Sequence, residues 1–443
     1  MSQLLLLQDY LRRSTERHPE RVALVMGERR VTYAELERDS ARLANLLRAH
    51  GVSRGDRVCL LLPKSPEAIA AMLGTLRAGA AYVPVDVSSP APRVQSILEA
   101  CEPRLVLACR QTTPLADELA RAGALNATIG LTDDSAGGES FAPAFRRAEW
   151  LSAGDELTSE HGAHDDLAHI LFTSGSTGVP KGVTITHANV THFVEWATAY
   201  FGTTETDRVS GHPPLHFDLS TFDIYGTLLA GAELHLVPPQ ESFQPDTLVR
   251  LIRDNELTQW FSVPSALTFM IKYGSIAHDD FPHLRRLIWC GEVIPTPTLI
   301  ELMRRLPHVS FTNLYGPTEA TIASSYHTMS APPGDPTAAI PIGTACAGEE
   351  LVVLDEQMRA VAAGETGEIY IGGVGLSPGY WRDAEKTAAA FRSRPGGDGF
   401  LAPGPSGDGF LAPGPGGDGV LATGSGSDAD GGLDRLYRTG DLA

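Results

Sequence analysis

The sequence predicts an α/β protein made of layered subdomains, with a smaller β-rich part towards its carboxyl end. Three observations point to this class. Short apolar runs typical of buried strands alternate with helical stripes over about the first 330 residues. Strand-like runs without such helices then follow at 351–354 and 368–371. Finally, 443 residues are too many for one small core and indicate two or three packed subdomains.

The amino-terminal residues show the alternation most clearly. In order, we expect a hairpin of strands at 22–25 and 31–33, a helix with a leucine stripe over 36–47, a buried strand at 57–62, a helix over 69–76 and a strand at 83–85. A polar connection follows residue 129. Beta character returns at 169–173, and a second αβ series runs to about 328. We therefore expect two αβ subdomains over about 1–330 and a β-rich subdomain over about 331–443.

A tandem repeat interrupts the β-rich part. Residues 395–404 read PGGDGFLAPG, and two similar decapeptides fill 405–414 and 415–424. Glycine and proline dominate, and the units lack the apolar content to pack, so 395–424 is interpreted as a flexible insertion. The alternative is a docking segment that uses Phe400 and Phe410 as anchors.

Charge and cysteine content narrow the functional classes. The net charge is −19 and no run of lysine and arginine occurs, so neither nucleic acid nor a membrane is an expected partner. Arg12 and Arg13 follow the first leucines instead of preceding them, which is unlike a signal peptide, and nothing resembles a membrane span. The five cysteines are scattered without CxxC spacing, which favours a reduced, cytoplasmic protein.

The strongest local signal is TSGSTGVPKG at 173–182. Its glycines allow close backbone approach to a ligand, its hydroxyl groups can donate hydrogen bonds, and Lys181 adds positive charge. The run follows an expected strand, where phosphate loops lie. It matches neither the Walker A pattern nor the Rossmann GxGxxG pattern. We therefore predict a phosphate-binding loop of another kind, the alternative being a flexible surface loop.

This run resembles the signature of the adenylate-forming superfamily, which contains acyl-CoA synthetases, luciferases and the adenylation domains of nonribosomal peptide synthetases. Further runs agree in the family's order: VTYAEL (31–36), LRAGAAYVPVD (76–86), FDLSTFD (217–223), NLYGPTEAT (313–321), GEIYIGGVGLSPGY (367–380) and YRTGDL (437–442). The second and fourth are similar to the amino-acid-activating branch. The resemblance implies the large amino-terminal domain of a ligase that uses ATP and Mg²⁺ to form an aminoacyl-AMP. A free-standing ligase fits, because nothing resembles a condensation or carrier domain, and a piece of a larger synthetase is the alternative. It also implies transfer of the aminoacyl group to the phosphopantetheine of a carrier protein.

The resemblance also implies nucleotide-binding roles. Tyr315 would stack on adenine, Thr318 would contact the α-phosphate, Glu319 would hold Mg²⁺ and Asp441 would bind the ribose hydroxyls. Lys181 would steady the β- and γ-phosphates together with the loop. The further positions implied around the nucleotide are Thr173, Ser174, Gly175, Ser176, Thr177, Gly178, Gly291, Asn313 and Gly316. Taken singly, Tyr315 could be a core residue and Asp441 a turn residue.

An acid marks the expected substrate pocket. In the amino-acid branch, an Asp at the place of Asp218 pairs with the substrate ammonium; the alternative reading is a helix cap, for which Asp is well suited. The remaining implied pocket positions are Phe217, Leu219, Phe222, Ser262, Ile288, Cys290, Leu314, Ile322 and Ala323. None of these carries a charge, so we expect a neutral substrate side chain. Phe222, Leu314 and Ile322 leave limited room, so we expect a small substrate such as alanine, serine or proline. The exact amino acid and its stereochemistry stay open.

Further expectations concern the end of the chain, the alternative functions and the histidines. In the family a small carboxyl-terminal domain with a lysine follows YRTGDL, whereas this chain stops at Ala443, so we expect a longer polypeptide; a natural remnant is the alternative. The alternative functions are an acyl-CoA synthetase-type ligase of the same fold and a non-catalytic docking module. His161, His164 and His169 are interpreted as residues of a solvated stretch and not as a metal site.

Overall fold

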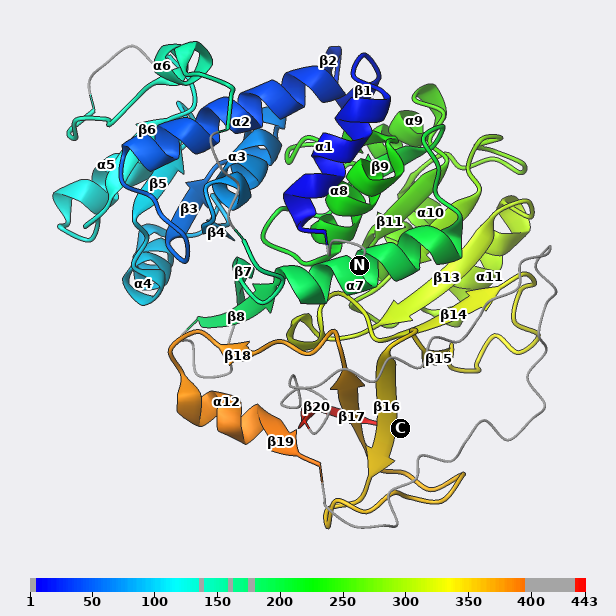
Figure 1. Ribbon diagram of the computed structural model, residues 1–443. Coiled ribbons are helices and arrows are strands. Elements are labelled where there is room, and N and C mark those ends of the chain that lie inside the picture. Colours follow the sequence, from blue (N-terminus) through cyan, green and yellow to red (C-terminus); the bar gives the residue numbers. More distant parts are fainter. Residues whose placement is uncertain (1–4, 135–138, 158–161, 174–179, 395–434) are drawn as a thin grey trace.

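The fold is described from a computed structural model, which covers residues 5–134, 139–157, 162–173, 180–394 and 435–443 (Figure 1). The decapeptide repeat and loop residues 174–179 lie outside these described residues. The described chain forms three β-sheets with helices packed around two of them, as the α/β prediction requires. No helix within the described ranges is long and apolar enough to cross a membrane.

The first sheet has the strand order β18-β8-β7-β4-β3-β5-β6. Its strands are β3 (Arg57–Leu61), β4 (Ala81–Pro84), β5 (Leu105–Ala108), β6 (Thr128–Leu131), β7 (Leu167–Thr173), β8 (Lys181–Thr186) and β18 (Gly379–Tyr380). Its helices are α2 (Tyr33–Ala49), α3 (Pro66–Arg77), α4 (Ala91–Cys101), α5 (Thr113–Arg121) and α6 (Arg147–Ser152). Strands β3 to β6 pair in parallel and are almost wholly buried, which explains their continuous apolar runs.

The second sheet has nine strands in the order β15-β14-β13-β12-β11-β9-β10-β1-β2. They are β1 (Val22–Met26), β2 (Arg29–Thr32), β9 (Arg208–Gly211), β10 (Glu233–Leu236), β11 (Gln259–Ser262), β12 (Arg286–Trp289), β13 (Ser310–Tyr315), β14 (Ser325–Met329) and β15 (Thr344–Ala345). The helices are α1 (Leu7–Arg17), α7 (His187–Phe201), α8 (Leu219–Ala230), α9 (Pro245–Asp254), α10 (Pro264–Tyr273) and α11 (Thr296–Arg305). The predicted amino-terminal hairpin thus joins a sheet whose other strands come after residue 207.

The two sheets share one winding. The path β3-α3-β4-α4-β5 places its strands in the order β4-β3-β5, and the path β9-α8-β10-α9-β11 gives β10-β9-β11. In each sheet, the second strand of the path lies on one side of the first strand, and the third strand lies on its other side. Ligands bind outside the carboxyl ends of strands at such reversals. The reversal in the second sheet lies where α8 begins, at Leu219.

A buried lysine ties the two halves together. Lys64 follows β3, is 5 % exposed, and its ammonium donates to the carbonyl oxygens of Gly211 and His212 at 2.6 Å and of Pro213 at 3.1 Å. Burial lowers the Lys64 pKa to about 7, and the carboxylate of Asp223 in α8 opposes that shift. The lysine therefore caps the carboxyl end of β9, immediately before the segment that leads to α8.

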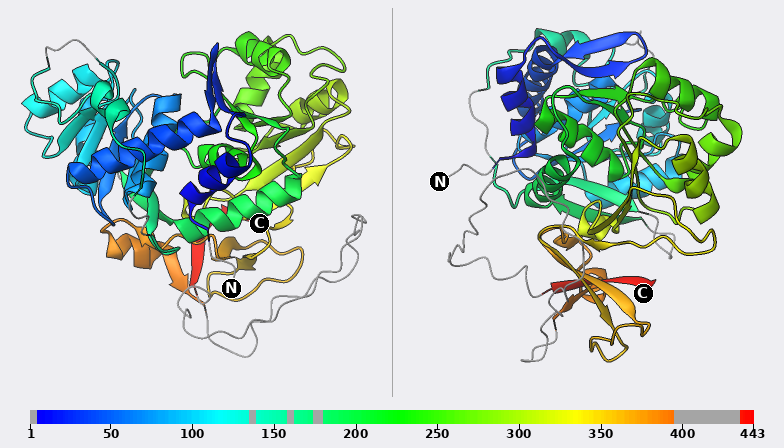
Figure 2. Two further views of the ribbon diagram at one scale, coloured as in Figure 1. Left: turned by 45° about the horizontal axis from the view of Figure 1, so that its top comes forward. Right: turned by 90° about the vertical axis from the view of Figure 1, so that its right-hand side faces the viewer.

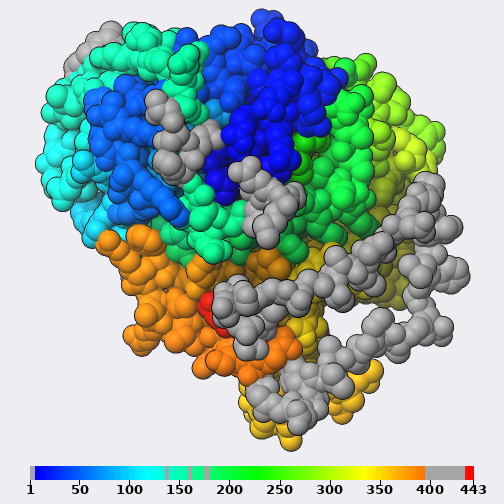
Figure 3. Space-filling model, in the orientation of Figure 1, coloured from blue at the N-terminus to red at the C-terminus, as the bar shows by residue number. Residues whose placement is uncertain are grey.

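The third sheet is antiparallel, with the order β16-β17-β20-β19. It comprises β16 (Glu349–Leu354), β17 (Glu368–Gly373), β19 (Phe391–Ser393) and β20 (Arg435–Leu442), and α12 (Ala384–Ala390) precedes β19. It forms the lower part of the molecule in Figures 1 and 2, and a separate lobe in the space-filling view of Figure 3. Strand β18 leaves this part and pairs with β8 of the first sheet, so the segment after β17 bridges the two.

Candidate nucleotide and substrate site

The largest group of expected nucleotide residues lines one cavity of about 620 Å³. Strands β12 and β13 run in parallel and end side by side, so the residues that follow them meet at one edge of the second sheet. The last residues of β20 close the cavity from the third sheet. Expected site residues in its lining are Gly291, Asn313, Leu314, Tyr315, Gly316 and Asp441.

Two residues that the sequence assigns to one nucleoside are in direct contact. The Tyr315 hydroxyl donates a hydrogen bond of 2.6 Å to Oδ2 of Asp441, although 126 positions separate them. Tyr315 ends β13 and Asp441 lies in β20, so the contact joins the second and third sheets. Burial and the neighbouring carboxylate raise the Tyr315 pKa, so the phenol stays protonated. The pair presents an aromatic face and a carboxylate to the same cavity.

Two glycines allow the turns that follow β12 and β13 at this edge of the second sheet. A Cβ on Gly316 would lie 2.5 Å from Cα of Ala323, so no larger residue fits the turn after β13. Gly291 has a φ of 91°, a conformation that favours glycine. Asn313 donates from its side-chain amide to the carbonyl oxygen of Pro341 at 2.8 Å, which makes it a support of the cavity wall.

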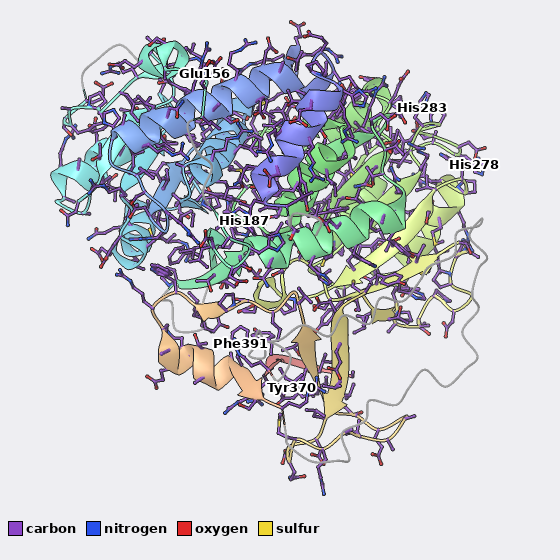
Figure 4. The ribbon with its side chains drawn as sticks, in the orientation of Figure 1. Glu156, His187, His278, His283, Tyr370 and Phe391 are labelled. Atoms are coloured by element: carbon purple, nitrogen blue, oxygen red, sulfur yellow. The ribbon has the colours of Figure 1, made fainter. Side chains whose placement is uncertain are left out.

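Glu319 lies in a short 3₁₀ helix, η1 (Thr318–Ala320), and is held from two sides. Its Oε1 accepts a 2.7 Å hydrogen bond from the Tyr380 hydroxyl, and its backbone carbonyl accepts from the amide of Ser377 at 2.9 Å. The ammonium of Lys181 lies 5.3 Å from the centre of the Tyr380 ring. Phe391, labelled in Figure 4, packs edge-on against that ring at 6.0 Å. Tyr380 therefore separates the expected phosphate cation from the expected metal ligand.

Tyr380 is a functional candidate that we did not predict. It stands in the run GEIYIGGVGLSPGY, and a tyrosine hydroxyl after a glycine turn was the available signal. Burial raises its pKa, and the carboxylate of Glu319 adds to that effect, so the hydroxyl keeps its proton and donates.

The residues around Glu319 fit a Mg²⁺ ion that is bound jointly by the protein and by nucleotide phosphates. No cluster of three or more His, Cys, Asp or Glu side chains among the described residues could hold a metal by itself. Magnesium is commonly bound by one or two carboxylates together with substrate phosphates. A single partly buried carboxylate suits an ion that arrives with a nucleotide.

Only the ends of the predicted phosphate loop are described. Thr173 ends β7 and pairs with Lys181 at the start of β8, so the two strands form an antiparallel hairpin around the loop. Ser174, Gly175, Ser176, Thr177 and Gly178 lie outside the described residues.

Asp218 is buried, with 8 % of its surface exposed. It occupies the N-cap position of α8, yet its side chain makes no capping hydrogen bond to that helix. Burial raises the pKa of its carboxyl to about 6; the nearby Thr318 hydroxyl opposes the shift and the charge of Glu319 adds to it. The carboxyl thus lies next to η1, in an environment that disfavours its charge unless a cation is present.

Most of the expected pocket residues lie in one buried apolar cluster with α8. Cys290 contacts the carbonyl oxygen of Ile322 at 3.7 Å, and burial raises its thiol pKa to about 12, with the charge of Asp218 contributing. Phe222 packs edge-on against Phe193 at 5.7 Å. The members of the cluster that were expected in the pocket are Leu219, Phe222, Ile288, Cys290, Leu314, Ile322 and Ala323.

Two expected pocket residues differ from the rest. Ser262 is fully buried and its hydroxyl accepts a 2.9 Å hydrogen bond from Nε1 of Trp260. Phe217 is 51 % exposed and stands outside the apolar cluster, beside His216. Its backbone amide still caps the turn before α8 by donating to Pro214 at 3.0 Å.

The loop between η1 and the pocket is strained. Thr321 and Ile322 have φ angles of 55° and 72°, although both are β-branched, a class that rarely adopts positive φ. The Thr321 hydroxyl donates to the carbonyl oxygen of Gly375 at 2.7 Å in a buried position. Such conformations persist when neighbouring contacts fix them, and they occur most often at functional sites.

Comparisons with known proteins find similar sequences over most of the chain. A family model described as AMP-binding enzyme matches residues 11–381. The chain is 35 % identical over 399 residues to an L-proline--[L-prolyl-carrier protein] ligase of Pseudomonas fluorescens, covering 89 % of this chain and 78 % of that protein. It is 32 % identical to a D-alanine--D-alanyl carrier protein ligase of Lacticaseibacillus rhamnosus, covering 84 % and 70 %.

Solved structures show the same fold. The nonribosomal peptide synthetase FmoA3 superposes with a TM-score of 0.79 at 29 % identity over 99 % of this chain, which spans 41 % of that larger chain. The amino-terminal subdomain of NpsA from Klebsiella oxytoca superposes with a TM-score of 0.74 at 24 % identity, covering 99 % and 96 %, and shows the fold alone. The resemblance and the fold class predicted from the sequence are confirmed.

Proposed function

The chain belongs to the AMP-binding enzyme family, and on that premise we propose that it activates a small neutral amino acid with ATP as an aminoacyl-AMP. We further propose that the aminoacyl group then passes to the phosphopantetheine thiol of a carrier protein. Relatives that are named as carrier protein ligases for proline and D-alanine support this assignment.

The observation that carries the proposal is the uncompensated acid at the pocket. Asp218 is buried beside apolar side chains, and burial raises its pKa to about 6. An amino acid arrives with a carboxylate and an ammonium group. If the carboxylate turns towards the nucleotide near Thr318, the ammonium faces the pocket wall, where Asp218 offers the charge that it needs. A fatty or aryl acid has no group for this carboxylate to bind.

The reaction asks mainly for alignment and charge neutralisation. An oxygen of the substrate carboxylate forms a bond to the α-phosphorus of ATP, and the bond from that phosphorus to the bridging oxygen breaks as pyrophosphate leaves. Two anions must therefore be held together in a dry site. Lys181 and the loop at 173–178 would neutralise the leaving group, and Thr318 would orient the α-phosphate. Glu319 would hold Mg²⁺, which supplies further positive charge to the phosphates when it is bound.

The pocket supports a short, uncharged side chain. Phe222, Leu314 and Ile322 are bulky and buried, and apart from Asp218 none of the expected pocket positions carries a charge. A charged substrate side chain would be left unpaired there, at a cost of several kcal/mol. Alanine, serine and proline are therefore the substrates we propose, with modest selectivity among them because one methylene discriminates only about 10–200-fold.

Pyrophosphate exchange measured with ATP and a panel of acids tests the proposal. We expect exchange with one or more of alanine, serine and proline, tested as both enantiomers, and none with fatty or aryl acids. Loading of a phosphopantetheinylated carrier protein, followed by intact-protein mass spectrometry, tests the second step. Exchange that depends on fatty acids would instead identify an acyl-CoA synthetase-type ligase, and nucleotide binding without exchange would identify a docking module.

A further inference from the structure

A second buried acid, Glu349, is connected through Gly375 to the loop that follows Thr318 and Glu319. Glu349 begins β16 and its side chain is 3 % exposed. Its Oε1 accepts a 2.8 Å hydrogen bond from the amide of Gly375 and lies 3.4 Å from Nε2 of His192 in α7. Its Oε2 has no hydrogen-bond partner among the described residues. Burial raises the Glu349 pKa, which marks a position where a carboxylate is costly.

Gly375 connects this acid to the loop at 318–322. While its amide donates to Glu349, its carbonyl oxygen accepts the 2.7 Å hydrogen bond from the Thr321 hydroxyl. A Cβ on Gly375 would lie 2.9 Å both from the carbonyl oxygen of Ala320 and from Oε1 of Glu349, so only glycine allows the three segments to meet. A continuous chain of contacts therefore runs from His192 through Glu349 and Gly375 to Thr321.

This series of contacts ends at Thr321, in the strained part of the loop at 318–322. Thr321 and Ile322 keep left-handed φ angles of 55° and 72°. Without support, β-branched residues relax towards negative φ. Such a change would move Glu319 on one side and the pocket residue Ile322 on the other. The near end is fixed by packing, because His192 lies against Gly348, where an added Cβ would come 2.3 Å from its ring.

We propose that Glu349 and His192 are positioning residues that hold the 318–322 loop in its strained conformation through Gly375 and Thr321. Neither side chain lies among the residues that line the nucleotide cavity. Their loss should therefore slow the chemical step and leave nucleotide affinity, which depends on Tyr315 and Asp441, almost unchanged. The inference rests on the proposed function, since the loop positions reacting groups only if an adenylate is formed.

The test compares variants of the full-length protein in ATP–pyrophosphate exchange and in calorimetric binding of a non-hydrolysable ATP analogue. For Glu349→Ala we expect kcat to fall by about 10–100-fold, the size associated with ångström-scale misplacement of reacting groups. We expect analogue affinity to stay within about threefold of wild type, because those contacts lie elsewhere. Glu349→Gln keeps an acceptor for the Gly375 amide and should restore most of kcat.

Two further variants make the test specific. Glu350→Ala removes the adjacent acid of the same strand, which binds Arg394 instead at 3.2 Å, and should leave kcat unchanged. Thr321→Val removes the hydroxyl at the other end of the chain but keeps the side-chain shape. It should reproduce the kcat loss of Glu349→Ala, and the double variant should be no slower than either single one, because contacts in one chain are non-additive.

The following results would overturn the positioning role or the proposed function. Wild-type kcat in Glu349→Ala, or equal losses in Glu349→Ala and Glu350→Ala, would overturn the positioning role. Multiplied losses in the double variant would also overturn it, since the two residues would then act independently. If Glu349→Ala does not fold, Thr321→Val and Glu349→Gln still carry the test. A wild-type protein that binds nucleotide but shows no exchange with any amino acid would overturn the proposed function, and this inference with it.

Discussion

Replacing Asp218 by Asn removes one charge and little else. Asn has nearly the size of Asp and is an equally good N-cap residue, so α8 should begin as before. A substrate ammonium would then be desolvated without an anion, which costs on the order of 3–5 kcal/mol. We expect amino-acid-dependent kcat/KM to fall at least about a hundredfold, while affinity for ATP, held by other residues, persists.

The same change should stabilise the substrate-free protein. The folded-state pKa of Asp218 is about 6, against about 3.9 in an unfolded chain. A shift of about two units corresponds to about 3 kcal/mol as an upper bound. Because the folded pKa is the higher one, ionisation opposes folding. The penalty is absent below about pH 4, grows as pH rises through 6, and is complete above about pH 7, so the variant should gain stability only at the higher pH.

Urea denaturation at pH 4 and pH 8, beside pyrophosphate exchange, checks both effects. Asp246→Asn is a control, because that acid is exposed in the first turn of α9. It should leave exchange unchanged and lower stability at pH 8 by at most about 1 kcal/mol, opposite in sign to the effect of Asp218→Asn. In the wild type, kcat/KM for the amino acid should fall below an apparent pKa of about 6, while KM for ATP does not follow that profile. Retained exchange in Asp218→Asn would refute the ammonium role.

Three further predictions follow from contacts around the site. Lys181→Ala should slow exchange by more than about tenfold with an unchanged melting temperature, because it removes charge from the leaving group; unchanged exchange would exclude a phosphate role. Tyr380→Phe keeps the ring beside Lys181 but removes the donor to Glu319, so the Mg²⁺ concentration for half-maximal exchange should change; an identical Mg²⁺ titration would contradict this. Lys64→Met deletes three hydrogen bonds to residues 211–213 and a positive charge that opposes the raised pKa of Asp223, and should lower the free energy of unfolding by roughly 3–5 kcal/mol. A loss below about 1 kcal/mol in urea denaturation would show that the carbonyls find other donors.

Local elements were predictable because they depend on neighbouring residues. The run at 57–62 predicts a buried strand, and β3 spans Arg57–Leu61; the apolar stripe at 69–76 lies within α3, which begins at Pro66 after its Ser65 cap. The strand expected at 368–371 lies in β17. Each signal is a periodicity or a cap carried by consecutive side chains, so no tertiary knowledge was needed.

The site was predictable only as a set of motifs. Asp218, Glu319 and Tyr315 are candidates through the resemblance, whereas their surroundings arise from contacts between distant segments. Tyr380 and Glu319 are 61 positions apart, and Lys64 meets the carbonyl of Gly211 147 positions away. No pattern along the chain encodes such pairings. The positive φ of Ile322 is also invisible in sequence, because a β-branched residue favours the opposite conformation.

Strands β19 and β20 flank the repeat and are hydrogen-bonded neighbours, with Ser393 opposite Arg435. The chain therefore leaves the third sheet and re-enters it at almost the same point. Doubling the length of a connecting segment adds only about 0.6 kcal/mol of closure entropy. Strand β20, which carries Asp441, is also paired with β17, where Ile371 lies opposite Tyr437. We therefore expect that a fluorescent reporter or an affinity tag inserted between β19 and β20 leaves the pairing of these strands intact.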